Sequence, residues 1–317
     1  MKKFGLRLSV LVLALILLAS PAFAAKLLVP VGQAVGLELQ GGGVTVVEVA
    51  SGSPGERAGL LPGDILSEAD GKVLTTPDAL FRALSDCRGS LSLTVRRGKD
   101  TLTIQAAPES GTRRLGITVR KGMAGIGTIT YYDPATGYFG ALGHGVSDPS
   151  GTLLSLESGT VLQASVADVE KGKIGTPGRL RGEFSPAQVL GELTRNTSYG
   201  VFGRSKEGWP GLALPVAEPE EVQVGPATIL SNVSGTEVRE YSVEILKIYP
   251  GERSYGRNLL LHVTDPRLLE ATGGIVQGQS GSPIVQNGRF VGAVTHVLVN
   301  DPTMGYGIFL KTMLNAA

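Results

Sequence analysis

The sequence predicts a mainly β protein with two folded units behind an N-terminal leader. Three observations favour this fold class. Glycine is unusually common, at 45 of 317 residues, and short segments of Val, Ile, Leu and Thr lie between glycine-containing turns. No long amphipathic helical pattern interrupts them. Charged residues make up 18% and hydrophobic residues 42% of the chain, a balance that excludes a disordered protein.

Residues 1–24 have the three parts of a secretory leader. Lys2, Lys3 and Arg7 precede an apolar stretch, and Ala22-Phe23-Ala24 forms an A-x-A cleavage signal. The stretch is short for a membrane span, which needs about 20 apolar residues, but an uncleaved membrane anchor stays open as the alternative. We therefore expect export across the cytoplasmic membrane. Removal of the leader turns the net charge from +1 to −2, and no Lys/Arg run indicates a nucleic-acid partner.

The first folded unit is predicted over residues 29–107. Its predicted elements are strands at 35–39 and 44–49 around a turn at 41–43, a helical turn at 53–60, a strand from 65, a hairpin turn at 70–72, a helix from 77, and strands at 91–95 and 101–104. Thr76 is expected to cap the helix, and Pro77 suits its first position.

The run at 58–65 (AGLLPGDI) resembles the signature of bacterial PDZ domains. The resemblance implies capture of a peptide by strand addition, with a chain terminus held by backbone amides. The matching loop is expected at Ala34, Val35, Gly36 and Leu37, where Gly36 leaves room for a carboxylate. The alternative is a PDZ unit that only packs against the rest of the chain. Residues 108–114 are the predicted linker.

The second unit is predicted over residues 115–317, where the strands become longer. A β-hairpin at 124–132 and 138–142 ends at the run Gly143-His144-Gly145. Further strands are expected at 160–168, 236–249, 257–264, 289–299 and 305–310. The simplest architecture for these strands is a pair of antiparallel β-barrels or a sandwich.

A serine nucleophile is predicted in the run at 278–283 (GQSGSP), which resembles the G-x-S-G-x-P loop of trypsin-like peptidases. Glycines on both sides of Ser280 favour a sharp loop, which can aim the N–H groups of Gly278 and Ser280 at one developing oxyanion. A serine hydroxyl needs a base, and His is the usual one. His144 is the candidate, because its flanking glycines expose the side chain. His262 is expected to be a buried structural histidine, and His296 could line the site.

Several longer runs closely resemble the stage IV sporulation protein B (SpoIVB) signalling peptidases of spore-forming Firmicutes. They are the runs at 30–36 (PVGQAVG), 124–128 (AGIGT), 139–148 (FGALGHGVSD), 273–283 (GGIVQGQSGSP) and 292–302 (GAVTHVLVNDP). The order of a PDZ domain before a peptidase agrees as well.

The resemblance implies a catalytic triad of His144, Asp265 and Ser280. Spacing alone leaves the acid open between Asp265 and Asp148, which lies four residues after His144 but is also typical of a turn. Gln279 stands where trypsin-like zymogens have an acid that binds a new amino terminus, so activation through that ion pair is not expected.

The resemblance also implies a role and a location. Such a peptidase cuts a membrane-associated partner in the forespore intermembrane space, which activates an intramembrane metalloprotease and sigma-factor processing, and it can cleave itself near its N-terminus. No cofactor is expected, since the sequence has no H-E-x-x-H motif and a single cysteine, Cys87. The alternative from another class is a catalytically inactive PDZ scaffold on a protease-like fold.

Overall fold

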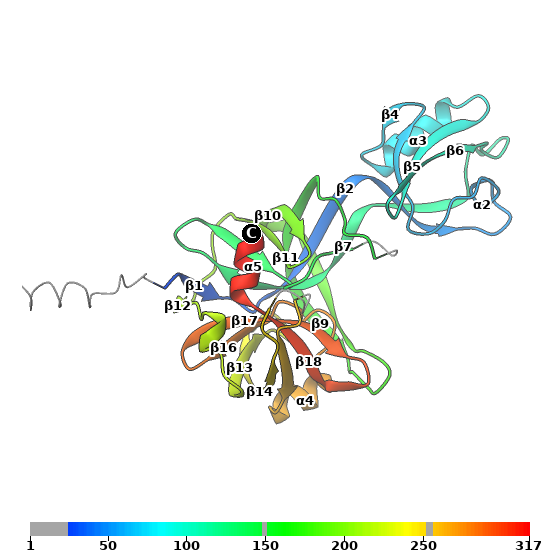
Figure 1. Ribbon diagram of the computed structural model, residues 1–317. Helices are drawn as coiled ribbons and strands as arrows, with labels where there is room; N and C mark the ends of the chain where they lie inside the picture. The colour runs from blue at the N-terminus through cyan, green and yellow to red at the C-terminus, as the bar shows by residue number, and fades with distance from the viewer. Residues whose placement is uncertain (1–24, 148–150, 252–255) are drawn as a thin grey trace, which may run out of the picture.

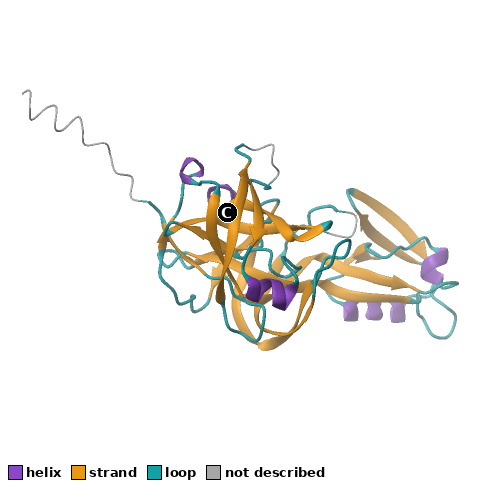
Figure 2. Cartoon of the chain, turned by 90° about the horizontal axis from the view of Figure 1, so that it is seen from below, coloured by secondary structure: helices purple, strands orange, loops and turns teal. Residues whose placement is uncertain are grey.

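The computed structural model describes residues 25–147, 151–251 and 256–317. Strands dominate it, and the few helices are short (Figures 1 and 2). The prediction of a mainly β fold is confirmed. Within the described residues no helix is both long and apolar enough to cross a membrane. The predicted leader at 1–24 lies outside these residues.

The first barrel is a closed ring of six antiparallel strands. In spatial order they are β2 (Ala34–Val49), β7 (Ile117–Tyr132), β8 (Tyr138–Ala141), β11 (Gly200–Ser205), β10 (Arg179–Thr197) and β9 (Ser158–Glu170). Each strand pairs with the next, and β9 pairs back with β2, which closes the ring. Short β1 (Leu27–Pro30) joins the ring at β7 and also pairs with β12 (Leu214–Pro215). The core alternates along the strands, as Val35, Leu37 and Leu39 show in β2.

The second barrel is also closed and antiparallel. Its spatial order is β13 (Gly225–Ser231), β14 (Arg239–Ile248), β15 (Leu259–Val263), β18 (Asp301–Phe309), β17 (Arg289–Leu298) and β16 (Pro283–Gln286). Helix α4 (Pro266–Thr272) follows β15, and α5 (Leu310–Ala316) follows β18. A 3-10 turn, η1 (Pro219–Glu221), lies before β13. The pair of barrels confirms one of the two architectures that the strand pattern allowed.

The PDZ unit is inserted between two strands of the first barrel. The outer parts of β2 and β7 leave the barrel as a two-stranded ribbon, on which the unit is built (Figure 1). It contains α2 (Pro54–Arg57), β3 (Ile65–Ala69), β4 (Lys72–Val73), α3 (Pro77–Asp86), β5 (Leu91–Arg97) and β6 (Asp100–Ala106). Thr76 caps α3 by accepting from the N–H of Ala79, as the sequence predicts.

The insertion corrects the predicted boundaries of 29–107. Strand β1 and the first part of β2 belong to the first barrel, because they pair with β7, β9 and β12. Gly41–Gly43 do not make a turn. The chain passes through them as a bulge within β2, where Gly42 has a φ of 62°.

The predicted linker at 108–114 is a turn inside the PDZ unit. Arg113 donates hydrogen bonds to the carbonyls of Ser85 and Cys87, just beyond α3. Leu115, which the sequence places in the second unit, is buried in the PDZ core together with Leu80 and Leu84. The PDZ unit therefore extends into the first residues of β7.

Candidate active site

Two loops meet where the barrels face each other. One follows β8 and turns through Leu142 and Gly143, with φ angles of 69° and 72°, to reach His144. The other joins α4 to β16 and contains Ser280. A Cβ on Gly281 would lie 2.6 Å from the N atom of Leu142, so the two loops are in direct contact. The structure thus places the loop of the predicted nucleophile in contact with the loop of the predicted base.

The hydroxyl of Ser280 is half-buried and engaged with the main chain. It donates a hydrogen bond of 2.8 Å to the carbonyl oxygen of Thr295 in β17. A hydroxyl has one proton, so in this conformation the proton is not directed at His144. To act as the predicted nucleophile, the Oγ atom would have to turn from Thr295 toward the histidine. Catalytic hydrogen bonds are often loose without substrate.

His144 is held as a neutral imidazole. Its Nδ1 atom lies 2.9 Å from the carbonyl oxygen of Gly145. Because a carbonyl only accepts, Nδ1 has the proton, and the lone pair of the ring is on Nε2. Burial lowers the pKa of His144 below its usual value, and the Gly145 carbonyl opposes this shift only in part. The ring is therefore unprotonated at neutral pH.

His296 lines the site beside His144, in agreement with the sequence-based expectation. The two ring centroids are 5.3 Å apart. Burial, the neighbouring His144 and Arg257 lower the pKa of His296 to about 4. Its Nδ1 atom is buried without a hydrogen-bond partner among the described residues. His262, by contrast, is half-buried on β15 between the core residues Leu261 and Val263, so the expectation of a buried structural histidine is wrong.

The loop at 278–281 leaves two amides available. Within the described parts of the chain, the N–H groups of Gly278 and Ser280 donate to no protein acceptor. Gly278 has a φ of 100°, which requires glycine. The assignment of these N–H groups to an oxyanion hole stays a prediction, and the geometry is compatible with it.

Gln279 anchors the same loop through its neutral side chain. The side chain is fully buried, accepts from the N–H of Val276 at 2.8 Å and donates to Ser231 Oγ at 3.1 Å. The position that holds a charged acid in trypsin-like zymogens is thus satisfied by neutral hydrogen bonds, and the loop needs no new amino terminus to hold it.

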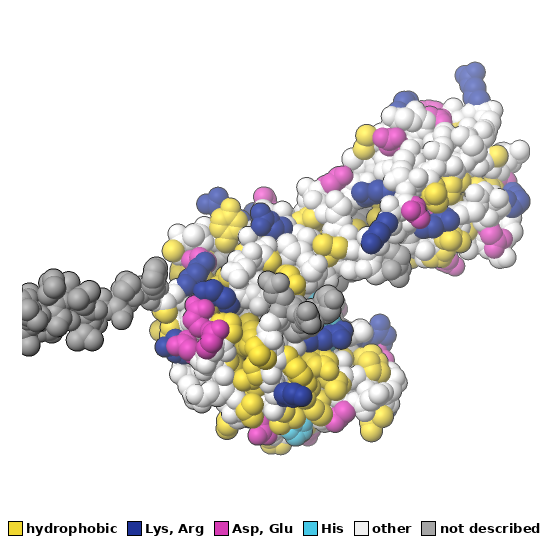
Figure 3. Space-filling model, viewed as in Figure 1, with side chains coloured by type: hydrophobic (Ala, Val, Ile, Leu, Met, Phe, Trp, Pro, Cys, Tyr) yellow, Lys and Arg dark blue, Asp and Glu magenta, His cyan; other side chains and the backbone are white. Residues whose placement is uncertain are grey.

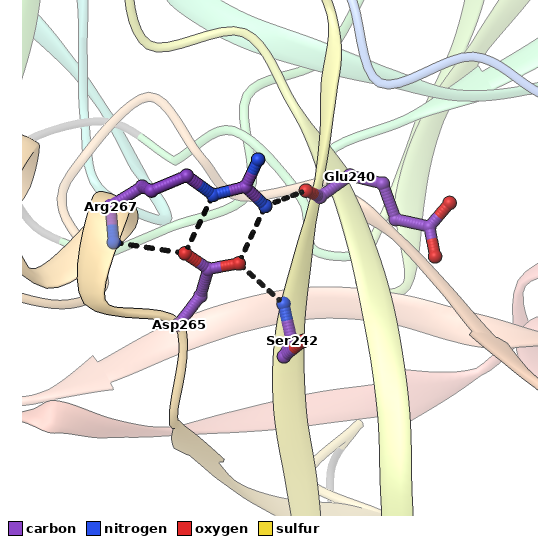
Figure 4. Close-up of polar contacts among 4 residues, drawn as sticks. All are labelled: Glu240, Ser242, Asp265 and Arg267. Carbon is purple, nitrogen blue, oxygen red and sulfur yellow. Dashed lines mark hydrogen bonds and ion pairs between the residues drawn. The ribbon is translucent and has the colours of Figure 1, made fainter.

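Asp265 is a structural residue in this fold. It caps α4, and its carboxylate forms an ion pair with Arg267 at 2.7 and 3.0 Å while accepting from the N–H of Ser242 (Figure 4). The Arg267 guanidinium, assisted by the Ser242 and Arg267 amides, holds the pKa of this carboxyl far below its usual range. Its side-chain contacts are thus with Arg267 at the start of α4 and with Ser242 on the neighbouring strand β14.

Strand register separates Asp265 from the site. Leu260 of β15 and His296 of β17 both pair with Tyr306, so they lie at one level of the barrel. Val263 is about 10 Å further along β15, and Asp265 lies beyond it. The structure therefore does not bring Asp265 into contact with His144, whose hydrogen-bond partner is the Gly145 carbonyl, and the triad assignment stays a prediction. The rival acid, Asp148, lies outside the described residues.

The predicted PDZ loop is also placed elsewhere. Ala34–Leu37 form the middle of the first barrel, where Gly36 pairs with Ile126 on one side and Leu162 on the other. A strand with both edges paired cannot accept a peptide, so this assignment is wrong. The loop is not exposed to a carboxylate, because a Cβ on Gly36 would lie 2.7 Å from the ring of Phe184.

A cleft of about 410 Å³ in the PDZ unit lies beside an open strand edge, which the predicted loop lacks. It lies between α3, which contributes Leu80, Phe81 and Leu84, and the segment from Arg114 to Val119 at the start of β7. Over this segment β7 pairs with β2 along one edge only, since its pairings with β1 and β8 begin beyond Thr128. The sequence signal that was missed is Gly116, which has a φ of 67°, directly before an apolar strand.

The PDZ unit projects away from the two barrels, with an open recess between it and the second barrel on the face drawn in Figure 3. Side chains of both charge signs are interspersed over this face.

Comparison with protein families gives two matches. A model described as SpoIVB peptidase S55 matches residues 111–314, and a PDZ domain model matches residues 45–97. The chain belongs to the SpoIVB peptidase S55 family. The resemblance seen in the sequence is thereby confirmed. The S55 match begins after the PDZ match, although the structure places β1 and the first part of β2 in the same barrel as β7 to β11.

Other similarities are partial. The serine protease HTRA1 of Xenopus laevis is 34% identical over 67 residues, which is 21% of this S55 chain and only 14% of that protein. Among solved structures, the Rv3671c protease in an inactive form has a TM-score of 0.36 and 14% identity, covering 61% of this chain and 82% of its own. An inactive serine-to-alanine mutant of Rv3671c from M. tuberculosis H37Rv has the same score and identity.

Proposed function

We propose that this chain is an exported serine endopeptidase that uses Ser280 as nucleophile and His144 as base. The single observation that supports this most is the state of His144. Its Nδ1 proton is fixed by the Gly145 carbonyl. Nε2 has no hydrogen-bond partner among the described residues, so it is available as a base, and the loop of His144 contacts the loop of Ser280. The role that an aspartate has in other triads, which is to fix this tautomer, is here performed by the main chain.

The reaction follows from these positions. Ser280 Oγ attacks the carbonyl carbon of the scissile bond and passes its proton to His144 Nε2. The N–H groups of Gly278 and Ser280 donate to the resulting oxyanion. His144 then gives the proton to the leaving amine, and an acyl-enzyme remains. Water, deprotonated by His144, hydrolyses the acyl-enzyme and releases Ser280.

The substrate is proposed to be a protein, held in part by the PDZ unit. The cleft between α3 and the start of β7 suits an extended segment that pairs with the open edge of β7 and ends near Gly116. By family membership, the partner is proposed to be a membrane-associated regulator of an intramembrane metalloprotease in the forespore intermembrane space. Its cleavage would signal for sigma-factor processing during sporulation, and self-cleavage near the N-terminus would fit the same activity.

Substitution of the nucleophile tests the proposal. Ser280→Ala should abolish cleavage of a peptide library, as followed by mass spectrometry, and a fluorophosphonate should label Ser280 in the parent only. Ser282→Ala is the matched control, because among the described residues its hydroxyl is hydrogen-bonded to Ser231 alone. If the folded parent neither cleaves nor becomes labelled, the inactive PDZ scaffold is the better description. Activity of Ser280→Ala within tenfold of the parent would move the nucleophile elsewhere.

A further inference from the structure

Thr128 of β7 is hydrogen-bonded to both loops of the candidate site. Its Oγ1 donates to the carbonyl of Gly278 at 2.7 Å, and its N–H donates to the carbonyl of Ser280 at 3.2 Å. Its own carbonyl accepts from the N–H of Leu142 at 3.2 Å, two residues before His144. The residue is 1% exposed and lies where the first barrel faces the second. It thus links the serine loop to the histidine loop.

We propose that Thr128 is a positioning residue, whose hydroxyl holds the loop of Gly278 and Ser280 in the shape that presents two N–H groups to the oxyanion. This inference rests on the proposed peptidase function. It assigns no contact between Thr128 and the substrate, because both hydroxyl and amide are already bonded to the loop.

Gly278 is the point at which this loop is free to change shape. A glycine at a φ of 100° has no Cβ to oppose rotation of the neighbouring peptide groups. Rotation there would turn the Gly278 N–H away from the oxyanion. The Gln279 side chain secures the loop on one side, through Val276 and Ser231. The Thr128 hydroxyl secures the Gly278 carbonyl from the opposite barrel and so fixes the peptide group between Gly278 and Gln279. This peptide group lies between the Gly278 N–H and the Ser280 N–H, so fixing it holds the two N–H groups in a constant relative orientation. The preceding peptide group, which contains the Gly278 N–H, is held separately, because the Gln277 carbonyl accepts from the N–H of Leu180 at 2.8 Å.

Thr130 provides an internal control on the same strand. It is two residues away on β7, at the register shift between Ile129 and Tyr131, and it is 0% exposed. Its hydroxyl has no hydrogen-bond partner among the described residues. Replacing either threonine by valine removes one buried hydroxyl at nearly constant volume. Only the change at Thr128 removes a bond to the serine loop.

The experiment compares the steady-state kinetics of Thr128→Val, Thr128→Ser and Thr130→Val in the full chain with a short peptide substrate. Loss of one oxyanion donor costs about 10²–10³ in kcat, so partial loss of its orientation should cost Thr128→Val about 10–100-fold in kcat with little change in KM. Thr128→Ser should recover most of that loss, and Thr130→Val should stay within about twofold of the parent. Binding of a peptide boronate, which mimics the tetrahedral intermediate, should weaken in parallel with kcat.

The outcomes separate the two proposals. An inactive, unlabelled parent refutes the peptidase function itself. An active parent with Thr128→Val near parental kcat overturns the positioning role, as does an equal loss in Thr130→Val. If Thr128→Val does not fold, Thr128→Ser and Thr128→Ala decide the question. A kcat that Ser retains and Ala loses, with circular dichroism spectra like that of the parent, supports the role, whereas equal kcat values in these two variants overturn it.

Discussion

Asp265 and Arg267 form a two-pronged ion pair at the first turn of α4, with N–O distances of 2.7 and 3.0 Å. Both residues hold α4 against β14, since Asp265 accepts from the N–H of Ser242 and Arg267 donates to the carbonyl of Glu240. The carboxylate that the sequence resemblance assigns to catalysis is therefore engaged in contacts that hold α4 in place.

Asp265→Asn is expected to affect stability rather than turnover. Asparagine can still cap α4 but cannot pair with Arg267, so Tm should fall by about 2–4 °C, while kcat/KM stays within about threefold. Loss of a tautomer-fixing aspartate would instead lower kcat by about 10⁴, as it does in trypsin. The pKa of Asp265 is lowered by folding, so its contribution exists above the unfolded pKa and disappears as the pH falls. The Tm difference between parent and variant should therefore vanish in acid.

The pH profile of kcat/KM should have its acid limb below the usual histidine value of 6.5. The active form of His144 is unprotonated, and burial lowers its pKa, so a falling pH protonates it later than it would an exposed histidine. Kinetics with an uncharged peptide across the range from acid to neutral pH give the midpoint. A midpoint above pH 7 would contradict the main-chain arrangement and indicate a carboxylate beside His144, for which Asp148 is the candidate to mutate.

Gly36→Val should damage the catalytic barrel rather than peptide capture. The added Cβ would meet the Phe184 ring at 2.7 Å within a strand that is paired on both edges. Overpacking of this kind costs about 1–3 kcal/mol in the free energy of unfolding. Urea unfolding measures that cost, and cleavage of short and protein substrates should decline together. Loss of the protein substrate alone would restore the sequence-based assignment of Gly36 to a peptide site.

Phe81→Asp should weaken peptide capture and spare the chemistry. Phe81 lies on α3 at the edge of the PDZ cleft and is 56% exposed, so a charge there disturbs an apolar groove without emptying a core. Binding of C-terminal peptides, measured by fluorescence anisotropy, should weaken at least about tenfold. Hydrolysis of a short peptide should not change. Val73→Asp is the matched control, because Val73 is 66% exposed on β4 and does not line the cleft. Equal peptide binding by both variants and the parent would exclude the cleft as the peptide-binding site.

Local sequence patterns predicted most elements but not their partners. The caps, turns and strand spacings around Thr76, the hairpin that leads to His144 and the sharp loop at Ser280 all depend on residues close in the chain, and the structure has each of them. The strand at 34–39 has the right alternation, yet nothing local distinguishes pairing with residues 44–49 from pairing with residues 123–128. Three glycines at 41–43 favoured a turn, whereas β2 continues through them and pairs with β7 on both sides.

The longest strand, β10 (Arg179–Thr197), was missed for a similar reason. It contains Gly182 and Pro186, both typical of turns, and its register shifts between Ser185 and Val189. The position of Asp265 could not be predicted either, since spacing in the sequence does not show which side chain reaches a histidine. The relative register of β15 and β17 determines how far Asp265 lies from the histidine, and the sequence does not give this register. The sequence did offer one local signal, because Arg267 stands two residues after Asp265 and can form an ion pair with it.

The ribbon that connects the PDZ unit to the first barrel has a consequence for the order of events during synthesis. Leu39 must find Met123, and the intervening loop of roughly 80 residues costs about 4 kcal/mol of closure entropy if it is unstructured. Once the PDZ unit has folded, Val44 and Lys121 are already paired, and the two barrel strands leave it side by side. The inserted domain would then nucleate barrel closure, before β9 to β11 have been translated. A variant that lacks the PDZ unit and joins the two barrel strands directly would keep every candidate catalytic residue. Its refolding rate, compared with that of the full chain, would show whether the PDZ unit speeds closure of the barrel.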